Sequence, residues 1–284
     1  MNANPLSQYF RQPAIYIKLP SQGNYYPPGS IEMPQTGDIP VLPMTAIDEI
    51  TYRTPDALFS GQAVINVIQS CVPAIKDAWA IPAMDIDTIL VGIRIASYGH
   101  EMNFGTSCPK CTHSAEYGLD LRTILDKIKT PDYSQPIKHG DIEIYFKPMT
   151  YKNLSENNKI QYEEQRIFQN ISSNATTNEN IDDNVKQISA MSNALKKMTE
   201  MTVSALSQSI AMIRTPSAMV SEHEYITEFI KNCDRGLFSR IQDYVIERKS
   251  QAEMQPVDVK CTECQNEYKQ SITLDMTSFF EPAS

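Results

Sequence analysis

Four of the six cysteines form two Cys-x-x-Cys motifs, and their types and spacing point to metal chemistry: Cys108, Cys111, Cys261 and Cys264. This spacing lets a tight turn direct two thiolates at one ion, and two such turns complete a tetrahedral shell that leaves no position for a substrate. In a protein made in a reducing cytoplasm, paired cysteines are more often metal ligands than disulfides. The motifs therefore predict one structural Zn²⁺ per chain, with these four cysteines as its ligands.

The two motifs lie in matching sequence contexts. Residues 108–121 read CPKCTHSAEYGLDL and residues 261–276 read CTECQNEYKQSITLDM, so a Glu-Tyr pair and a closing Leu-Asp follow each motif. A redox-active pair would need a strand-to-helix junction that lowers a thiolate pKa, whereas strand-like residues follow here. The repeat favours one shared metal site over a pair of reduced, metal-free turns. We expect His113 on the surface and Cys71 and Cys233 as small buried residues.

Strand-like residues on both sides of each motif predict a zinc ribbon. The expected strands are 101–104, 115–121, 257–259 and 267–274. Because the two pairs of ligands lie far apart in the sequence, the two ends of the intervening segment, residues 112–260, must come close together in the fold. In the chain-entropy relation for cross-links, closing a loop of this length is worth on the order of 4–5 kcal/mol. We therefore interpret the site as architectural rather than catalytic.

The other elements predict an α+β fold, in which a mixed strand-and-helix domain with the ribbon carries a helical insertion. The predicted parts are 1–149 with the first zinc knuckle, 150–253 as the helical insertion, and 254–284 with the second knuckle and the tail, completing the ribbon with 100–121. Alternation at 141–147 predicts a strand of the first part. Residues 172–184, which contain no large apolar residue except Ile181, should form a mobile loop or the tip of a helix hairpin. A helix from about 185 to 213 would form a hairpin with residues 150–171, or offer its apolar stripe to a partner.

Composition excludes several classes of protein. An apolar fraction of 41% with 21% charged residues is ordinary for a soluble globular protein. The net charge is −9, and basic residues cluster no further than pairs, which argues against a sequence-independent nucleic-acid binder. The N-terminus lacks the features of a signal peptide, and the most apolar stretch, 86–96, is too short and too charged to span a bilayer. We expect neither nucleic acid nor a membrane as a partner.

Catalytic motifs are also missing. The sequence has no His-Glu-x-x-His, no glycine-rich phosphate loop and no nucleophile elbow. The acid pairs Glu163/Glu164 and Asp182/Asp183 are expected on the solvated surface of a helix and in the polar loop. The four histidines have no spacing that implies catalysis: His100, His113, His139 and His223. The sequence therefore predicts no enzyme, but a structural or assembly protein that acts by binding.

Three segments resemble the T4-type tailed-phage (myovirus) baseplate protein family, in its hub or hub-assembly member. They are NPLSQYFRQPAIYIKLPSQGNYYPPGS (4–30), DEITYRTPDALFSGQAVINVIQSCVPAIKDAW (48–79) and DIDTILVGIRIASYG (85–99). The resemblance covers most of the chain and is most specific over residues 4–121. In that family this block leads to one Cys-x-x-Cys, a helical insertion follows, and a second Cys-x-x-Cys closes the chain. The four cysteines therefore transfer position by position.

The resemblance implies a non-enzymatic virion protein of the baseplate hub of a contractile tail, or a tail-assembly chaperone absent from the mature virion. Its partners would be other baseplate and tail proteins in an oligomeric assembly. It would be located in the virion tail baseplate, and in the host cytoplasm during assembly. From another class, a zinc-ribbon adaptor that binds nucleic acid is disfavoured, because the ribbon lysines are set among glutamates: Lys110, Lys260 and Lys269 among Glu116, Glu263 and Glu267.

Overall fold

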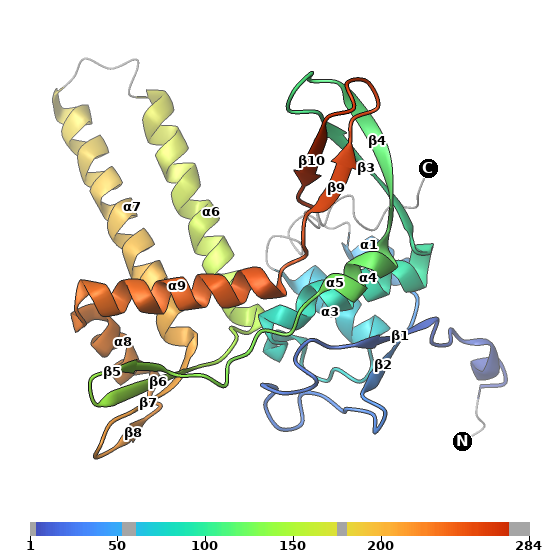
Figure 1. The fold of residues 1–284 in the computed structure, drawn as a ribbon, viewed down its shortest axis with the longest axis horizontal. Helices are drawn as coiled ribbons and strands as arrows, with labels where there is room; N and C mark the ends of the chain where they lie inside the picture. The colour runs from blue at the N-terminus through green and yellow to red at the C-terminus, as the bar shows by residue number, and fades with distance from the viewer. Residues whose placement is uncertain (1–3, 53–60, 175–180, 273–284) are drawn as a thin grey trace. The chain divides into compact units, whose positions relative to one another are not determined.

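The computed structural model describes residues 4–52, 61–174 and 181–272, and it combines helices with small antiparallel sheets (Figure 1). The α+β class is thereby confirmed. Contacts divide the chain into unit 1, Met1–Pro131 with Lys249–Ser284, and unit 2, Asp132–Arg248. Both ends of the sequence thus contribute to one unit. In the part of the chain that the structure describes, no helix is long and apolar enough to cross a membrane.

Unit 1 combines three two-stranded antiparallel sheets with helices packed around a central one. Its elements are η1 (Ser7–Tyr9), β1 (Ile15–Lys18), β2 (Asp38–Val41), α1 (Ala46–Tyr52), α3 (Gln62–Cys71), η2 (Ala78–Ala80), α4 (Ala83–Tyr98), β3 (Glu101–Ser107), β4 (Ser114–Asp120), α5 (Leu121–Lys127), β9 (Val257–Lys260) and β10 (Glu267–Gln270). The central helix is α4, which contacts β1, β2, α3 and α5. Its apolar residues are buried as their periodicity predicts, among them Ile86, Ile89, Leu90 and Ile93.

The sheet of β1 and β2 lies close against α4. In the antiparallel register Ile15 faces Val41 and Ile17 faces Ile39. Alternation along the strands buries Ile17, Ile39 and Val41 on one side. A Cβ atom at Gly92 of α4 would lie 3.0 Å from Ile17 Cγ2 and 3.7 Å from Val41 Cγ2. The absence of a side chain at Gly92 therefore sets how closely the helix approaches the sheet.

Unit 2 is a four-stranded antiparallel sheet with helices. The sheet has the order β5 (Ile137–His139), β6 (Ile142–Phe146), β7 (Ile210–Arg214) and β8 (Met219–Val220), and the helices are α6 (Tyr151–Asn174), α7 (Ile181–Gln208), α8 (His223–Asn232) and α9 (Arg235–Ala252), whose last residues belong to unit 1. Helices α6 and α7 run side by side as a hairpin (Figure 1). A core of buried residues joins the sheet to α7, α8 and α9: Ile137, Ile144, Phe146, Val203, Leu206, Ile210, Ile213, Ile226, Ile230, Leu237 and Ile241.

Two predictions about the helical region are wrong at their boundaries. The helix expected to reach residue 213 ends at Gln208, and Ile210–Arg214 forms strand β7, in which Ile213 pairs with Ile144. A spacing of three between Ile210 and Ile213 suits a helix, but pairing with β6 decides the conformation. Helix also extends into both ends of the range 172–184, which was expected to be a loop or the tip of a helix hairpin. Residues 175–180 lie outside the described residues.

The alternating stretch 141–147 is a strand, as predicted, and it belongs to the sheet of unit 2. The sequence had assigned it to the first part of the chain. Contacts place the change between units at residues 131 and 132, and again at 248 and 249. The ranges 1–149, 150–253 and 254–284 remain a prediction about domains.

Candidate metal centre

The structure brings the two Cys-x-x-Cys motifs together in unit 1. One Sγ atom from each of Cys108, Cys111, Cys261 and Cys264 lies within 4.8 Å of all the others. The Sγ atoms of Cys108 and Cys264 are 3.7 Å apart, and those of Cys111 and Cys261 are 3.6 Å apart. Four thiolates at the usual Zn–S distance of about 2.3 Å occupy tetrahedral corners separated by about 3.8 Å. These two separations match that value and none of the others exceeds 4.8 Å, so a small contraction of the cluster would complete a tetrahedral zinc site.

Two antiparallel hairpins position the sulfurs. Strands β3 and β4 pair along their whole length on either side of the first motif, and β9 and β10 do the same for the second. The hairpins lie side by side (Figure 1), and the Thr106 hydroxyl donates to Gln270 Oε1 across them at 2.6 Å. The four expected ribbon strands are present, with different ends. Leu121, predicted to end the second strand, begins α5 instead. The fourth strand, β10, ends at Gln270, so residues 271 and 272 are not in a strand as predicted, and Leu274 lies outside the described residues.

The two turns share one backbone design, which explains the repeat in the sequence. The amide of Thr112 donates to the Cys108 carbonyl at 2.9 Å, and the amide of Gln265 donates to the Cys261 carbonyl at 3.1 Å. Thr112 and Gln265 have φ angles of 58° and 57°, in the left-handed region that L-residues with side chains rarely adopt. Each turn thus curls around its two cysteines, and the strained position falls four residues after the first cysteine in both copies.

Electrostatics at the cluster favour a bound cation. Desolvation acts to raise the pKa of the Cys108 thiol, but the backbone amides of Cys111 and Lys110 lower it to about 6. The His113 amide acts to lower the pKa of the Cys111 thiol, whereas the Cys264, Cys261 and Cys108 side chains together raise it to about 12. Four thiolates this close repel one another, and a divalent cation removes that repulsion as it displaces the thiol protons. The donor set therefore fits Zn²⁺.

The arrangement suits a structural site rather than a catalytic one. Cys108 and Cys261 are buried, Cys264 is half-buried and Cys111 is exposed, so the centre lies at the rim of the ribbon. A metal ion held by all four cysteines would have no open position for a substrate or an activated water. Among the described residues, no second group of three or more cysteine, histidine, aspartate or glutamate side chains has metal-ligand spacing. His113 is half-buried beside the first turn and is not a member of the cluster.

The other sequence-predicted residues are dispersed. His139 lies 3.5 Å from Asp234 in unit 2, and His223 lies 3.5 Å from the Thr227 hydroxyl on α8. Asp182 and Asp183 are in the first turn of α7 rather than in a loop. Cys71 is buried as expected, whereas Cys233 is only half-buried, so that prediction is wrong in degree. None of these residues forms a site with the cysteine cluster.

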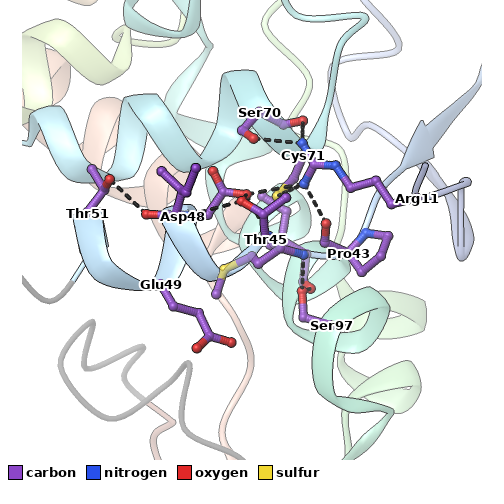
Figure 2. A network of polar contacts seen from close by, with 12 residues as sticks. Arg11, Pro43, Thr45, Asp48, Glu49, Thr51, Ser70, Cys71 and Ser97 are labelled. Atoms are coloured by element: carbon purple, nitrogen blue, oxygen red, sulfur yellow. Dashed lines mark hydrogen bonds and ion pairs between the residues drawn. The ribbon is translucent and has the colours of Figure 1, made fainter. Parts of the chain in front are cut away.

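A polar network that the sequence did not predict surrounds Arg11 in unit 1 (Figure 2). The Arg11 guanidinium donates to the Pro43 carbonyl at 2.6 Å, to Asp48 Oδ2 at 3.2 Å, and to the Ser70 carbonyl and hydroxyl at 2.7 Å each. Burial, with the nearby charge of Asp48, raises the pKa of the Cys71 thiol to about 12. Cys71 therefore stays protonated at neutral pH, and the network ties the N-terminal segment to α1 and α3.

Burial acts to raise the pKa of Asp48, but hydrogen bonds from Thr45 and Ser70 and the charge of Arg11 hold it below its usual range. The Thr45 amide and hydroxyl donate to Asp48 Oδ2 at 2.7 Å and 2.8 Å. Asp48 is thus ionised at neutral pH and fixes the start of α1. A lone arginine and a lone aspartate in separate segments carry no spacing signal, so only the fold could reveal this pairing.

Comparison with known protein families identifies a family that matches this chain. Residues 44–281 match the model of the T4 bacteriophage base plate protein family. Comparison with curated proteins and with solved structures found no match. The matched range covers most of the chain and contains both cysteine turns, and the resemblance seen in the sequence is thereby confirmed. Such membership indicates a non-enzymatic, structural role in the phage tail baseplate, in contact with other tail proteins. The chain belongs to the T4 bacteriophage base plate protein family.

Proposed function

We propose that this chain is a component of the baseplate hub of a contractile phage tail and acts through protein–protein binding. The family match over residues 44–281 is the observation that carries this proposal. The closed cysteine cluster supports it, because a site without an open ligand position serves architecture rather than catalysis. Oligomeric assembly takes place within the baseplate, after synthesis in the host cytoplasm.

In this proposal Zn²⁺ is bound by Cys108, Cys111, Cys261 and Cys264 and clasps the two ends of unit 1. The support is the approach of β3–β4 to β9–β10, since the whole of unit 2 lies between them in the sequence. Each hairpin has only two strands, and isolated two-stranded hairpins are marginal in water. A metal shared by both turns would fix one hairpin on the other. The clasp thereby holds together two parts of unit 1 that unit 2 separates in the sequence.

A transient hub-assembly chaperone is the alternative within the same family. Quantitative mass spectrometry of purified virions and of infected cells distinguishes the two roles. A hub component is retained at a fixed ratio to the major tail proteins after purification, and antibodies or cryo-electron microscopy locate it on the tail axis. A chaperone is abundant in infected cells and missing from virions. Retention at the periphery of the baseplate would contradict the hub assignment and leave the family unaffected.

A zinc-ribbon adaptor for nucleic acid finds little support at the ribbon. The Lys260 ammonium lies 3.9 Å from the Glu267 carboxylate, so part of its charge is compensated. The exposed side chains of β9 and β10 alternate between acidic and basic, namely Asp258, Lys260, Glu267 and Lys269. Salt-dependent retention of the purified chain on DNA would support the hypothesis of a nucleic-acid adaptor.

A further inference from the structure

The second cysteine turn carries a side chain that reaches the first turn. Asn266 is the last residue of the second turn and directly precedes β10. Its side-chain amide Nδ2 lies 3.9 Å from Cys108 Sγ, a distance at which an N–H group can still donate to the large sulfur atom. Asn266 and Cys108 are 158 residues apart in the sequence. This contact therefore links the two Cys-x-x-Cys motifs through a residue that is not itself a cysteine.

The backbone holds Asn266 in the position from which it reaches the sulfur. The Asn266 carbonyl accepts a hydrogen bond from the Cys261 amide at 2.9 Å. The preceding residue, Gln265, turns the chain with its φ of 57°, and the following residue, Glu267, pairs with Lys260 across the hairpin. The side chain of Asn266 is half-buried. Because the residue is already ordered, little entropy is lost when its amide donates.

Cys108 is the sulfur at which hydrogen-bond donors converge. It is 1% exposed, so water cannot solvate a negative charge on it. The backbone amides of Lys110 and Cys111 donate to this sulfur from its own turn. Asn266 adds a donor from the opposite turn, which also brings Cys264 Sγ to 3.7 Å from Cys108 Sγ. Hydrogen bonds to an ionised acceptor are stronger than those to a neutral one, so these donors favour the thiolate form that binds a metal.

The first turn has a different residue at the matching position. His113 follows Thr112, whose φ is 58°, and the His113 carbonyl accepts the Cys108 amide at 2.9 Å. His113 is half-buried, as Asn266 is, but in the part of the chain that the structure describes its ring is not a member of the cysteine cluster. The two turns thus share one backbone design, whereas only the second places a side-chain donor on a sulfur of the other.

We propose that Asn266 is a positioning residue of the metal centre, whose side-chain amide donates to the Cys108 thiolate of the opposite turn and thereby raises the affinity of the cluster for Zn²⁺. Partners of this kind orient metal ligands, and their removal typically costs roughly 10–100-fold in metal affinity. The inference rests on the zinc site of the proposed function and adds to it a residue outside the four ligands.

Competition against a chromophoric zinc chelator tests this role on the full chain. Asn266→Leu keeps the branched shape of the side chain and removes its donor, and it should raise the dissociation constant for Zn²⁺ roughly tenfold or more. His113→Leu makes the same kind of change at the matching position of the first turn and should leave the constant unchanged. Asn266→Ala removes the donor without an apolar branch and should weaken binding as Asn266→Leu does. Circular dichroism verifies that each metal-loaded variant is folded.

The absorption spectrum of the Co²⁺-substituted protein separates a bond to the sulfur from a role in folding alone. A hydrogen bond lowers the energy of the sulfur lone pairs, so its loss should move the sulfur-to-cobalt charge-transfer band to longer wavelength. We expect this shift in both Asn266 variants and not in His113→Leu. A residue that only stabilised the turn would leave the band in place.

Three results would overturn the role of Asn266 while zinc binding by the wild type still supports the clasp. They are wild-type zinc affinity in both Asn266 variants, equal weakening by His113→Leu, and a charge-transfer band that does not move. A wild-type protein that binds no zinc would instead contradict the clasp, and the role of Asn266 would fall with it. The failure of this inference is thus distinguishable from the failure of the proposed zinc site.

Discussion

Replacing Arg11 by alanine should destabilise unit 1 more than the loss of a surface ion pair does. The Arg11 side chain joins three segments of unit 1 through Pro43, Asp48 and Ser70 (Figure 2). Alanine removes four hydrogen bonds donated to oxygen atoms and a longer one, of 3.9 Å, to Cys71 Sγ. It also leaves the carboxylate of Asp48 without its cation. The carbonyl of Ser70 also loses its side-chain donor. The Pro43 and Ser70 carbonyls become acceptors that entering water must satisfy, whereas Asp48 Oδ2 keeps its two donors from Thr45 but loses its countercharge.

The size of the expected stability loss depends on how buried the groups are and on the fact that a single side chain, Arg11, makes all the bonds. Hydrogen bonds that involve a charged group contribute about 1.5–3 kcal/mol each, but four bonds from one side chain do not add. The side chains of Arg11 and Asp48 are 24% and 11% exposed, so water replaces part of what is lost. We expect the free energy of unfolding of unit 1 to fall by about 3 kcal/mol for Arg11→Ala. Arg11→Lys keeps the charge but not the planar fork, and should cost about half as much.

Urea unfolding followed by tryptophan fluorescence measures this loss. The only tryptophan of the chain, Trp79, lies in η2 of unit 1 and so reports on that unit. Lys76→Ala is the control, because the ammonium of Lys76 pairs with Glu32 at 3.0 Å and the two side chains are 45% and 72% exposed. That pair should contribute less than about 0.5 kcal/mol. If Arg11→Ala and Lys76→Ala lower stability equally, the network does not stabilise unit 1 and the reasoning fails.

Three further predictions concern unit 1. Gly92→Ala should lower the stability of unit 1 by about 1–3 kcal/mol in the same urea assay, because the new Cβ would lie 3.0 Å from Ile17, and an unchanged midpoint would contradict the close approach. Burial raises the pKa of Asp85 from 3.8 to about 6, so the folded state holds a proton that the unfolded state loses between these values. Stability should therefore fall as pH rises from 4 to 6, by roughly 2–3 kcal/mol from this group, and the slope in urea titrations should be smaller in Asp85→Asn. Thr112 has a φ of 58°, a backbone conformation that glycine adopts more easily than residues with a side chain. Thr112→Gly should therefore keep or raise the Tm of the metal-loaded protein, and Thr112→Val should lower it. The opposite order of Tm values in thermal scans would show that the backbone at Thr112 is not strained.

The ribbon was predictable from the sequence because its signals are local. Each Cys-x-x-Cys turn is flanked by its own pair of strands, and the two copies support one another. The helix α4 was predictable for a similar reason, since its apolar residues recur at helical spacing and most of them are buried.

Features that depend on distant partners were missed. Residues 210–214 continue the apolar spacing of α7, and only pairing with β6 makes them a strand. Strands β5 and β8 have three and two residues, too few for a periodic signal. The Arg11 network joins residues up to 60 positions apart, and no pattern along the chain marks them as partners. Tertiary contacts decide each of these cases.

Metal analysis by inductively coupled plasma mass spectrometry, on protein purified without added metal, tests the zinc clasp most directly. Cys261→Ser removes one buried member of the cluster, and Cys233→Ser is its control, a half-buried cysteine whose thiol contacts the Ile230 carbonyl outside the cluster. The account predicts one zinc per chain in the wild type and in Cys233→Ser, with similar Tm values. In Cys261→Ser the zinc should be lost and the Tm should fall sharply. Metal-free wild-type protein, with four freely alkylated thiols and a Tm unaffected by Cys261→Ser, would contradict the clasp.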